Sequence, residues 1–142
     1  MKKNLNSEYH RGKWNERVVT ELPLFKLWPS VKKCTMANAN GSPFFDNVKD
    51  SIEKNGMRFP ILVVQSDYAE LVKQKARFKQ GMCELPTEED FTGFTVWGGS
   101  NRFWVAKELG YDTVDVVIYK TFQNAWNDQH LHRKPYKEEL YT

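Results

Sequence analysis

The sequence predicts a small α+β domain in which helices pack on a mixed β-sheet. Short runs of apolar and β-branched residues alternate with segments whose apolar residues recur at helical spacing. Glycine and proline separate most of these segments. Of the 142 residues, 40% are hydrophobic and 27% are charged, which is typical of a globular chain, and the length fits one domain.

The N-terminal part of the chain is expected to begin with a flexible arm. Residues 1–17 are polar and show no hydrophobic period, whereas residues 18–28 are apolar and predict a first strand. Pro23 and Pro29 indicate either an edge of the sheet or a strand boundary here, because proline cannot donate a hydrogen bond to a strand ladder.

The middle of the chain predicts a helix, a strand and an inserted helix. Asp46 is a suitable N-cap for a helix that ends at Asn55-Gly56. Residues 60–64, Pro-Ile-Leu-Val-Val, are typical of a buried strand. Residues 66–81 predict a second helix, which an acidic loop follows.

The last third of the chain predicts two strands, 94–97 and 114–119, on either side of a helix over 101–109 that stops at Gly110. A short helix and a polar tail follow. The expected organisation is a flexible arm (1–17), a domain (18–120) with an insertion at about 66–92, and a C-terminal helix and tail (121–142).

The junction between the strand at 94–97 and the next helix is the candidate site. It reads Trp97-Gly98-Gly99-Ser100-Asn101-Arg102. Glycine lets the backbone approach a ligand closely, and a helix N-terminus offers unpaired N–H groups and a positive dipole end. Ser100 and Asn101 can donate to a phosphate, and the fork of Arg102 can bind two phosphate oxygens. The pattern predicts a phosphate-binding turn; the alternative is a tight turn beside a surface arginine.

The residues from Phe45 to Tyr119 resemble the ParB/sulfiredoxin superfamily. Its members show a helix ending in Ser-Ile and a glycine, a Pro-Ile strand, a Gly-x-x-Arg turn, and a helix ending in Leu-Gly before a last strand. The matching segments occur here in that order: Val48 to Gly56, Pro60 to Val63, Trp97 to Ala106, Leu109-Gly110-Tyr111, and Val114 to Val117.

The resemblance implies a ParB/sulfiredoxin-like fold that binds a nucleoside triphosphate, ATP or CTP, together with Mg2+. Gly99 and Arg102 would hold the phosphates, and Ser51, Pro60 and Ile61 would approach the rest of the nucleotide. ParB proteins use CTP, sulfiredoxins use ATP, and related members include a free-serine kinase and nucleases. Stand-alone members occur in phages, which implies a phage origin and a role in DNA transactions.

The chain departs from both groups at the turn. Sulfiredoxins carry Gly-Gly-Cys-His-Arg, and here Ser100 and Asn101 replace the cysteine and the histidine. A serine hydroxyl without a base cannot replace a nucleophilic thiolate, so sulfiredoxin activity is not expected. ParB proteins usually carry Glu-Arg at these two positions, and no helix-turn-helix domain follows residue 119, so a complete partition protein is not expected.

Charge and apolar content set expectations about partners. The net charge of +3 permits contact with a polyanion without demanding it. Lysines and an arginine in the inserted helix can contact nucleic-acid phosphates, although an ordinary solvated face is the alternative: Lys73, Lys75, Arg77 and Lys79. No membrane span or secretory signal is expected, and the predicted location is the cytoplasm, which is the host cytoplasm if the chain is viral.

The cysteines and histidines do not predict a metal site or thiol chemistry. Cys34 and Cys83 are isolated, and the three histidines (His10, His130 and His132) are expected to be solvated. The acidic residues of the inserted loop either bind Mg2+, serve as a base, or form ordinary solvated surface: Glu84, Glu88, Glu89 and Asp90.

These features predict a nucleotide-binding module, accessory to DNA transactions, that acts by binding, because no general base stands beside the turn. Two alternatives stay open. One is a nucleotide-dependent enzyme of the same fold, an NTP hydrolase, phosphotransferase or nuclease, whose acid would come from residues 84–90. The other is a protein-binding scaffold that has lost nucleotide binding.

Overall fold

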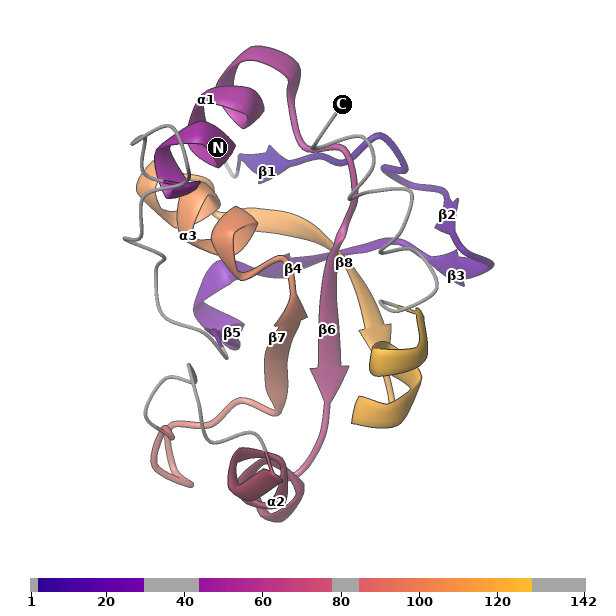
Figure 1. The fold of residues 1–142 in the computed structure, drawn as a ribbon, viewed down its shortest axis with the longest axis vertical. Helices are drawn as coiled ribbons and strands as arrows, with labels where there is room; N and C mark the ends of the chain where they lie inside the picture. Colours follow the sequence, from indigo (N-terminus) through magenta and orange to yellow (C-terminus); the bar gives the residue numbers. More distant parts are fainter. Residues whose placement is uncertain (1–2, 30–43, 78–84, 129–142) are drawn as a thin grey trace.

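The computed structural model describes residues 3–29, 44–77 and 85–128. A six-stranded sheet forms its centre, in the order β1-β8-β6-β7-β5, and β4 pairs with β8 outside this order (Figure 1). The pairs β1/β8, β6/β8 and β5/β7 are parallel, whereas β4/β8 and β6/β7 are antiparallel. The predicted α+β class with a mixed sheet is therefore confirmed. The strands are β1 (Asn4–Leu5), β4 (Thr20–Pro23), β5 (Leu27–Pro29), β6 (Ile61–Gln65), β7 (Phe94–Gly98) and β8 (Thr113–Tyr119).

Strands β6 and β8 lie in the middle of the sheet because their side chains are apolar on both faces. Ile61, Val63, Val116 and Val117 are all fully buried. Successive side chains of a strand point to opposite faces, so such a run needs cover on both sides of the sheet. The prediction of a buried strand after Pro60 is confirmed.

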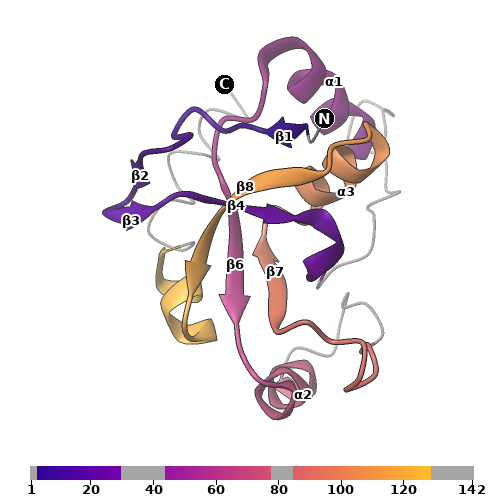
Figure 2. The ribbon, with the colours of Figure 1, turned by 180° about the vertical axis from the view of Figure 1, so that it is seen from behind.

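Helices cover both faces of the sheet (Figures 1 and 2). On one face α1 (Phe44–Asn55) packs against α3 (Ser100–Glu108), and their buried residues join those of the strands below. On the other face lie α2 (Tyr68–Arg77) and a helix over 122–128, which bring Leu71 and Phe122 to a second apolar cluster. None of the helices in the described part of the chain is long and apolar enough to cross a membrane.

The expected boundaries of α2, where it is described, and of α3 hold within one or two residues, but the expectation that Asp46 is an N-cap is wrong: α1 begins at Phe44, and Asp46 lies within its first turn. Asp67 caps α2, since its Oδ1 accepts the Glu70 N–H at 2.8 Å. The expected stop of this helix at Gly81 lies outside the described residues, as do Cys34, Cys83, His130 and His132.

The predicted first strand, 18–28, is divided into two. β4 and β5 are separated by a 3-10 turn, Leu24–Lys26, which carries the chain from β8 to β7. Pro23 and Pro29 each end one of these strands, and within the described chain each strand has one neighbour in the sheet. The edge placement inferred from the prolines is confirmed.

The expectation of a flexible N-terminal arm is wrong for residues 3–17. β1 pairs with β8, and β2 (Lys13–Trp14) pairs with β3 (Arg17–Val18) in a hairpin. Leu5 and Trp14 are buried. Two-residue strands are too short to display a hydrophobic period, which is why the sequence pattern resembles an arm.

A polar cluster fastens the C-terminal helix to this hairpin. Asp128 accepts a hydrogen bond from the Tyr119 hydroxyl at 2.7 Å and another from Arg17 Nε at 2.5 Å. The Arg17 guanidinium also lies 4.4 Å from the centre of the Tyr119 ring. Burial alone would raise the pKa of Asp128, but the hydrogen bonds from Tyr119 and Arg17 outweigh it and lower that pKa. Burial and the neighbouring Asp128 raise the pKa of Tyr119 above its usual range.

This cluster predicts a loss of stability in acid. Because the pKa of Asp128 is lower in the folded state, the unfolded chain binds more protons as the pH falls. The contribution of Asp128 is therefore present above its unfolded pKa of about 3.9 and is lost as the pH falls through the folded pKa. We expect Asp128→Asn to lower the free energy of unfolding by about 1–3 kcal/mol at pH 7 and by much less near pH 3.

Urea unfolding of the wild type and of Asp128→Asn between pH 7 and pH 3 measures this effect. Tyr119→Phe removes one donor to Asp128 and should produce part of the same pH-dependent loss. A difference between the wild type and Asp128→Asn that is constant over this range would contradict the assignment.

Candidate functional site

The turn between β7 and α3 has the geometry of an open helix N-terminus. Gly98 ends β7, Gly99 follows in the left-handed conformation (φ 95°, ψ 32°), and α3 begins at Ser100. Gly99 is the N-cap residue, so no side chain at that position accepts from the first turn of the helix. The backbone N–H groups of this turn consequently lack intrahelical acceptors and carry the positive end of the helix dipole.

The two glycines are required by the protein's own packing. A Cβ on Gly98 would lie 3.1 Å from the Leu62 side chain, which crosses it from β6. A Cβ on Gly99 would lie 2.5 Å from Nη2 of Arg102 and 2.8 Å from its Cζ. The space that the absent Cβ atoms leave is therefore filled by Leu62 and Arg102.

Arg102 joins the turn to the segment before β6. Its Nη1 donates to the carbonyl oxygens of Phe59 at 2.5 Å and Pro60 at 3.0 Å, and its guanidinium lies against Gly99. The arginine is half-buried. It therefore fixes the relative positions of the two segments and places a permanent positive charge beside the N-terminus of α3.

The fold brings together some, but not all, of the residues predicted for this site. Residues 98–102 and Pro60 meet through Arg102. Ile61 is fully buried and paired with Val116 of β8, so its side chain belongs to the core. Ser51 is exposed on α1.

The acidic residues considered as a catalytic base lie at the far end of β7. Glu88, Glu89 and Asp90 are exposed in a turn just before this strand, and Glu84 lies outside the described residues. The Tyr68 hydroxyl donates to the Pro86 carbonyl at 2.7 Å and holds this loop beside α2. The length of β7, about 13 Å, therefore separates these acidic residues from Gly98 and Gly99.

The basic helix is also remote from the turn. β6 and β7 are antiparallel, with Leu62 opposite Gly98 and Gln65 opposite Phe94, so the helix that follows β6 lies at the other end of the sheet (Figure 1). Lys73 is exposed on α2. The side chains of Lys75 and Arg77, and all of Lys79, lie outside the described residues.

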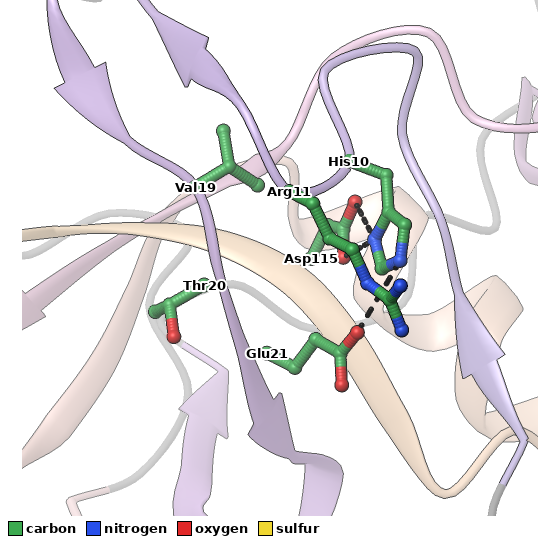
Figure 3. Close-up of a pocket in the computed structure, with 6 residues that line it drawn as sticks. All are labelled: His10, Arg11, Val19, Thr20, Glu21 and Asp115. Atoms are coloured by element: carbon green, nitrogen blue, oxygen red, sulfur yellow. Dashed lines mark hydrogen bonds and ion pairs between the residues drawn. The ribbon is translucent and has the colours of Figure 1, made fainter.

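A second polar cluster, His10–Glu21–Asp115, was missed by sequence reasoning (Figure 3). His10 was expected to be solvated, but its side chain is only 22% exposed, and its Nδ1 lies 2.9 Å from an oxygen of the fully buried Asp115. With Arg11, Val19 and Thr20, the cluster lines a hollow of about 340 Å³. The three residues come from distant parts of the chain, so no spacing in the sequence indicates the cluster.

Comparison with known proteins finds similarity in structure. No family model matches the chain, and no curated protein matches it in sequence. The structure is similar to a sulfiredoxin from Arabidopsis thaliana, with a TM-score of 0.46 and 19% identity, over 78% of this chain and 94% of the sulfiredoxin. It is also similar to a C-terminally truncated ParB from Caulobacter crescentus complexed with CTP-gamma-S. For this pair the TM-score is 0.46 and the identity 17%, over 75% of this chain and 47% of the ParB chain.

Proposed function

We propose that this protein binds a phosphate ester, in the form of a nucleotide, at the turn between β7 and α3, and that it acts by binding. One observation carries the proposal. A glycine in the left-handed conformation opens α3 without a capping side chain, and the guanidinium of Arg102 is fixed beside it.

The chemistry of the turn suits an anion. A phosphate placed at the start of α3 accepts hydrogen bonds from backbone N–H groups and gains from the helix dipole. Ser100 and Asn101 are half-buried at the same place and add a hydroxyl and an amide donor. The charge of Arg102 adds to the attraction. These groups bind a phosphate, but none of them is a nucleophile or a base at neutral pH.

Binding rather than catalysis is proposed because of where the acids lie. The exposed carboxylates of residues 88–90 are separated from the glycines by the length of β7. A nucleotide that spans the turn would therefore not meet them. Mg2+ would be held by the phosphates themselves, which is its usual mode with nucleotides.

Titration with nucleotides tests the proposal. ATP, CTP, GTP and ADP are added to the full chain with and without Mg2+, and phosphate release is measured in the same samples. We expect at least one nucleotide to bind, and Arg102→Ala to weaken binding by about tenfold or more, in line with the loss of a charge-assisted hydrogen bond. Arg102→Lys keeps the positive charge but lacks the planar guanidinium, so its affinity for the nucleotide should lie between those of the wild type and Arg102→Ala.

Lys107→Ala is the matched control, because it removes one positive charge from the exposed last turn of the same helix. It should leave the affinity within about twofold of wild type, since a dipole or charge effect acts mainly within the first turn. Thermal unfolding of each variant establishes that the fold is retained.

The three predicted functions give different results. Binding without turnover supports the proposal. Turnover that Arg102→Ala abolishes would replace it with the nucleotide-dependent enzyme. If none of the nucleotides binds at millimolar concentration, both are wrong, and the protein-binding scaffold is left. DNA binding and a protein partner stay predictions, and a DNA contact through α2 would be independent of the turn.

A further inference from the structure

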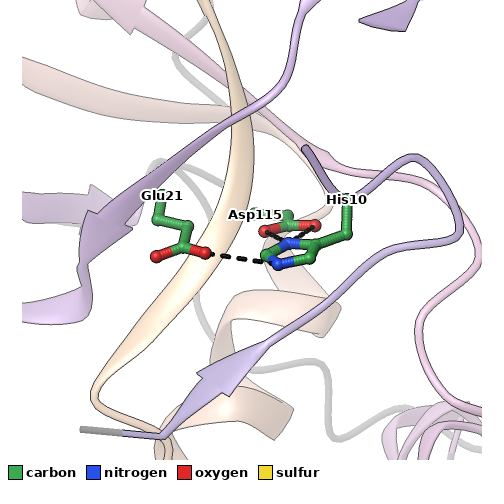
Figure 4. A group of neighbouring side chains, drawn as sticks. All are labelled: His10, Glu21 and Asp115. Carbon is green, nitrogen blue, oxygen red and sulfur yellow. Dashed lines mark hydrogen bonds and ion pairs between the residues drawn. The ribbon is translucent and has the colours of Figure 1, made fainter. Parts of the chain in front are cut away.

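The His10–Glu21–Asp115 cluster brings two carboxylates together on adjacent strands. Glu21 of β4 lies directly opposite Asp115 of β8 in the antiparallel register. Like charges directly opposite each other destabilise a sheet. The ring of His10, from the turn after β1, contacts both carboxylates (Figure 4). The ligand atoms of the three side chains lie within 4.8 Å of one another.

Asp115 orients the imidazole of His10. The carboxylate of Asp115 accepts from Ser7 N at 2.7 Å, Ser7 Oγ at 3.1 Å and Asn4 Nδ2 at 2.9 Å. It also lies 2.9 Å from His10 Nδ1. Because a carboxylate with these donors can only accept, Nδ1 of His10 must carry a proton and donate it. The ring is therefore held with Nε2 facing Glu21.

Nε2 of His10 faces Glu21 and lies 3.4 Å from its Oε1. Because Nδ1 is held by Asp115, Nε2 is the ring nitrogen that is directed toward a ligand on the side of Glu21. A carboxylate that orients a histidine, whose other nitrogen binds the metal, is a recurring arrangement at zinc sites.

The separation of the two atoms matches a tetrahedral metal. Zinc bonds of about 2.0–2.2 Å to nitrogen and oxygen put two ligands of a tetrahedron about 3.4 Å apart. The same bond lengths at the right angle of an octahedron would put them about 3.0 Å apart, which is the preference of Mg2+. A histidine ligand also favours zinc over Mg2+ and Ca2+.

We propose that Nε2 of His10 and the carboxylate of Glu21 bind a zinc ion, with Asp115 as the positioning residue behind His10. The Glu21 side chain is 44% exposed, so a metal can reach it from solvent. The hollow of about 340 Å³ in front of the pair leaves room for water or an oxygen ligand in the remaining coordination positions. Two protein ligands are fewer than the four of a structural zinc site, so the other coordination positions would be left to water or to a bound ligand.

Arg11 lines the same hollow and modulates the site. Its guanidinium places a positive charge on the path to the metal, which opposes binding of a cation. Removing this charge should therefore strengthen zinc binding. An anionic ligand of the metal would be attracted by the same group.

The test measures zinc itself. Chelator-treated full-length protein is titrated with Zn2+ by calorimetry, in a background with His130→Gln and His132→Gln, because these two histidines can bind zinc independently. Co2+ then replaces Zn2+, and its visible absorption reports a tetrahedral site. We expect one ion per chain, loss of binding in His10→Ala, and weakening on the order of tenfold or more in Glu21→Gln.

Two further variants sharpen the result. Glu8→Gln, an exposed glutamate of the same N-terminal segment, should bind zinc like the parent, whereas Arg11→Ala should bind it more tightly. Zinc should raise the Tm of the parent and not that of His10→Ala. If the parent binds no zinc at millimolar concentration, or if His10→Ala and Glu21→Gln bind it as well as the parent does, the proposal is wrong and the three side chains form a structural contact only.

Discussion

Replacing Asp115 with alanine is expected to lower the free energy of unfolding by about 3–5 kcal/mol, the usual cost of removing one member of a buried charged cluster. The carboxylate is fully buried and accepts hydrogen bonds from Asn4, Ser7 and His10. Alanine would leave the buried N–H of Ser7 without this acceptor and would release the ring of His10. Because these donors all lie in the first ten residues, the loss should detach the N-terminal segment from β8.

Urea unfolding measures the loss, and hydrogen exchange locates it. In Asp115→Ala the amides of residues 3–12 should exchange faster than those of β6. Asp115→Asn keeps the shape but turns an amide donor toward other donors, so it should cost about 1–3 kcal/mol.

The matched control is Asp112→Ala. This exposed aspartate accepts a hydrogen bond, at 2.9 Å, from the backbone N–H of Lys3 in the same N-terminal segment. Its removal should cost less than about 1 kcal/mol. A loss of that size in Asp115→Ala as well would show that the buried carboxylate does not anchor the segment.

Gly99→Ala is expected to lower the free energy of unfolding by about 2–4 kcal/mol and to weaken nucleotide binding. Alanine in the left-handed conformation costs about 1–2 kcal/mol. Its Cβ would also lie 2.5 Å from Nη2 of Arg102, so the guanidinium must move and lose its hydrogen bonds to Phe59 and Pro60. That loss adds about 1–2 kcal/mol and displaces the charge from the turn.

Gly110→Ala separates the cost of the left-handed backbone from the cost of the clash with Arg102. Gly110 also has a positive φ, 81°, but a Cβ there would meet nothing within 4 Å. It should show the backbone cost alone and bind nucleotide like the wild type. In addition, Gly99→Ala combined with Arg102→Ala should cost less than the sum of the two changes, because the clash is then absent. Equal losses in Gly99→Ala and Gly110→Ala, or simple additivity, would contradict the close packing of Arg102 on Gly99.

Local chemistry explains why most elements of the fold could be predicted. The run from Ile61 to Val64 has no polar side chain and follows a proline, which is typical of a buried strand. Asp67 stands where a helix needs an acceptor for its first N–H groups. Pro23 and Pro29 exclude the middle of a sheet. Each of these conclusions depends on residues within a few positions of one another.

The N-terminal segment could not be predicted in the same way. Its strands of two residues bury Leu5 and Trp14 without any repeating pattern, and their partners are more than a hundred residues away or across a tight hairpin. The stability of the segment comes from Asp115 and from the backbone of β8. The backbone N–H of Glu8 also donates to the carbonyl of Arg58 at 3.3 Å. The N-terminal segment therefore lies beside Phe59 and Pro60, whose carbonyls accept hydrogen bonds from Arg102.

The sequence by itself determined the α+β class, the order of the main elements and the position of the glycine turn before α3, because helix and strand periods, caps and prolines act over short distances. Only the tertiary structure decided what Arg102 contacts and that Ile61 belongs to the core. It alone brought His10 between Glu21 and Asp115, because that meeting depends on the register of β4 against β8. Strand register is set by the packing of the whole sheet, and no local pattern in the chain records it.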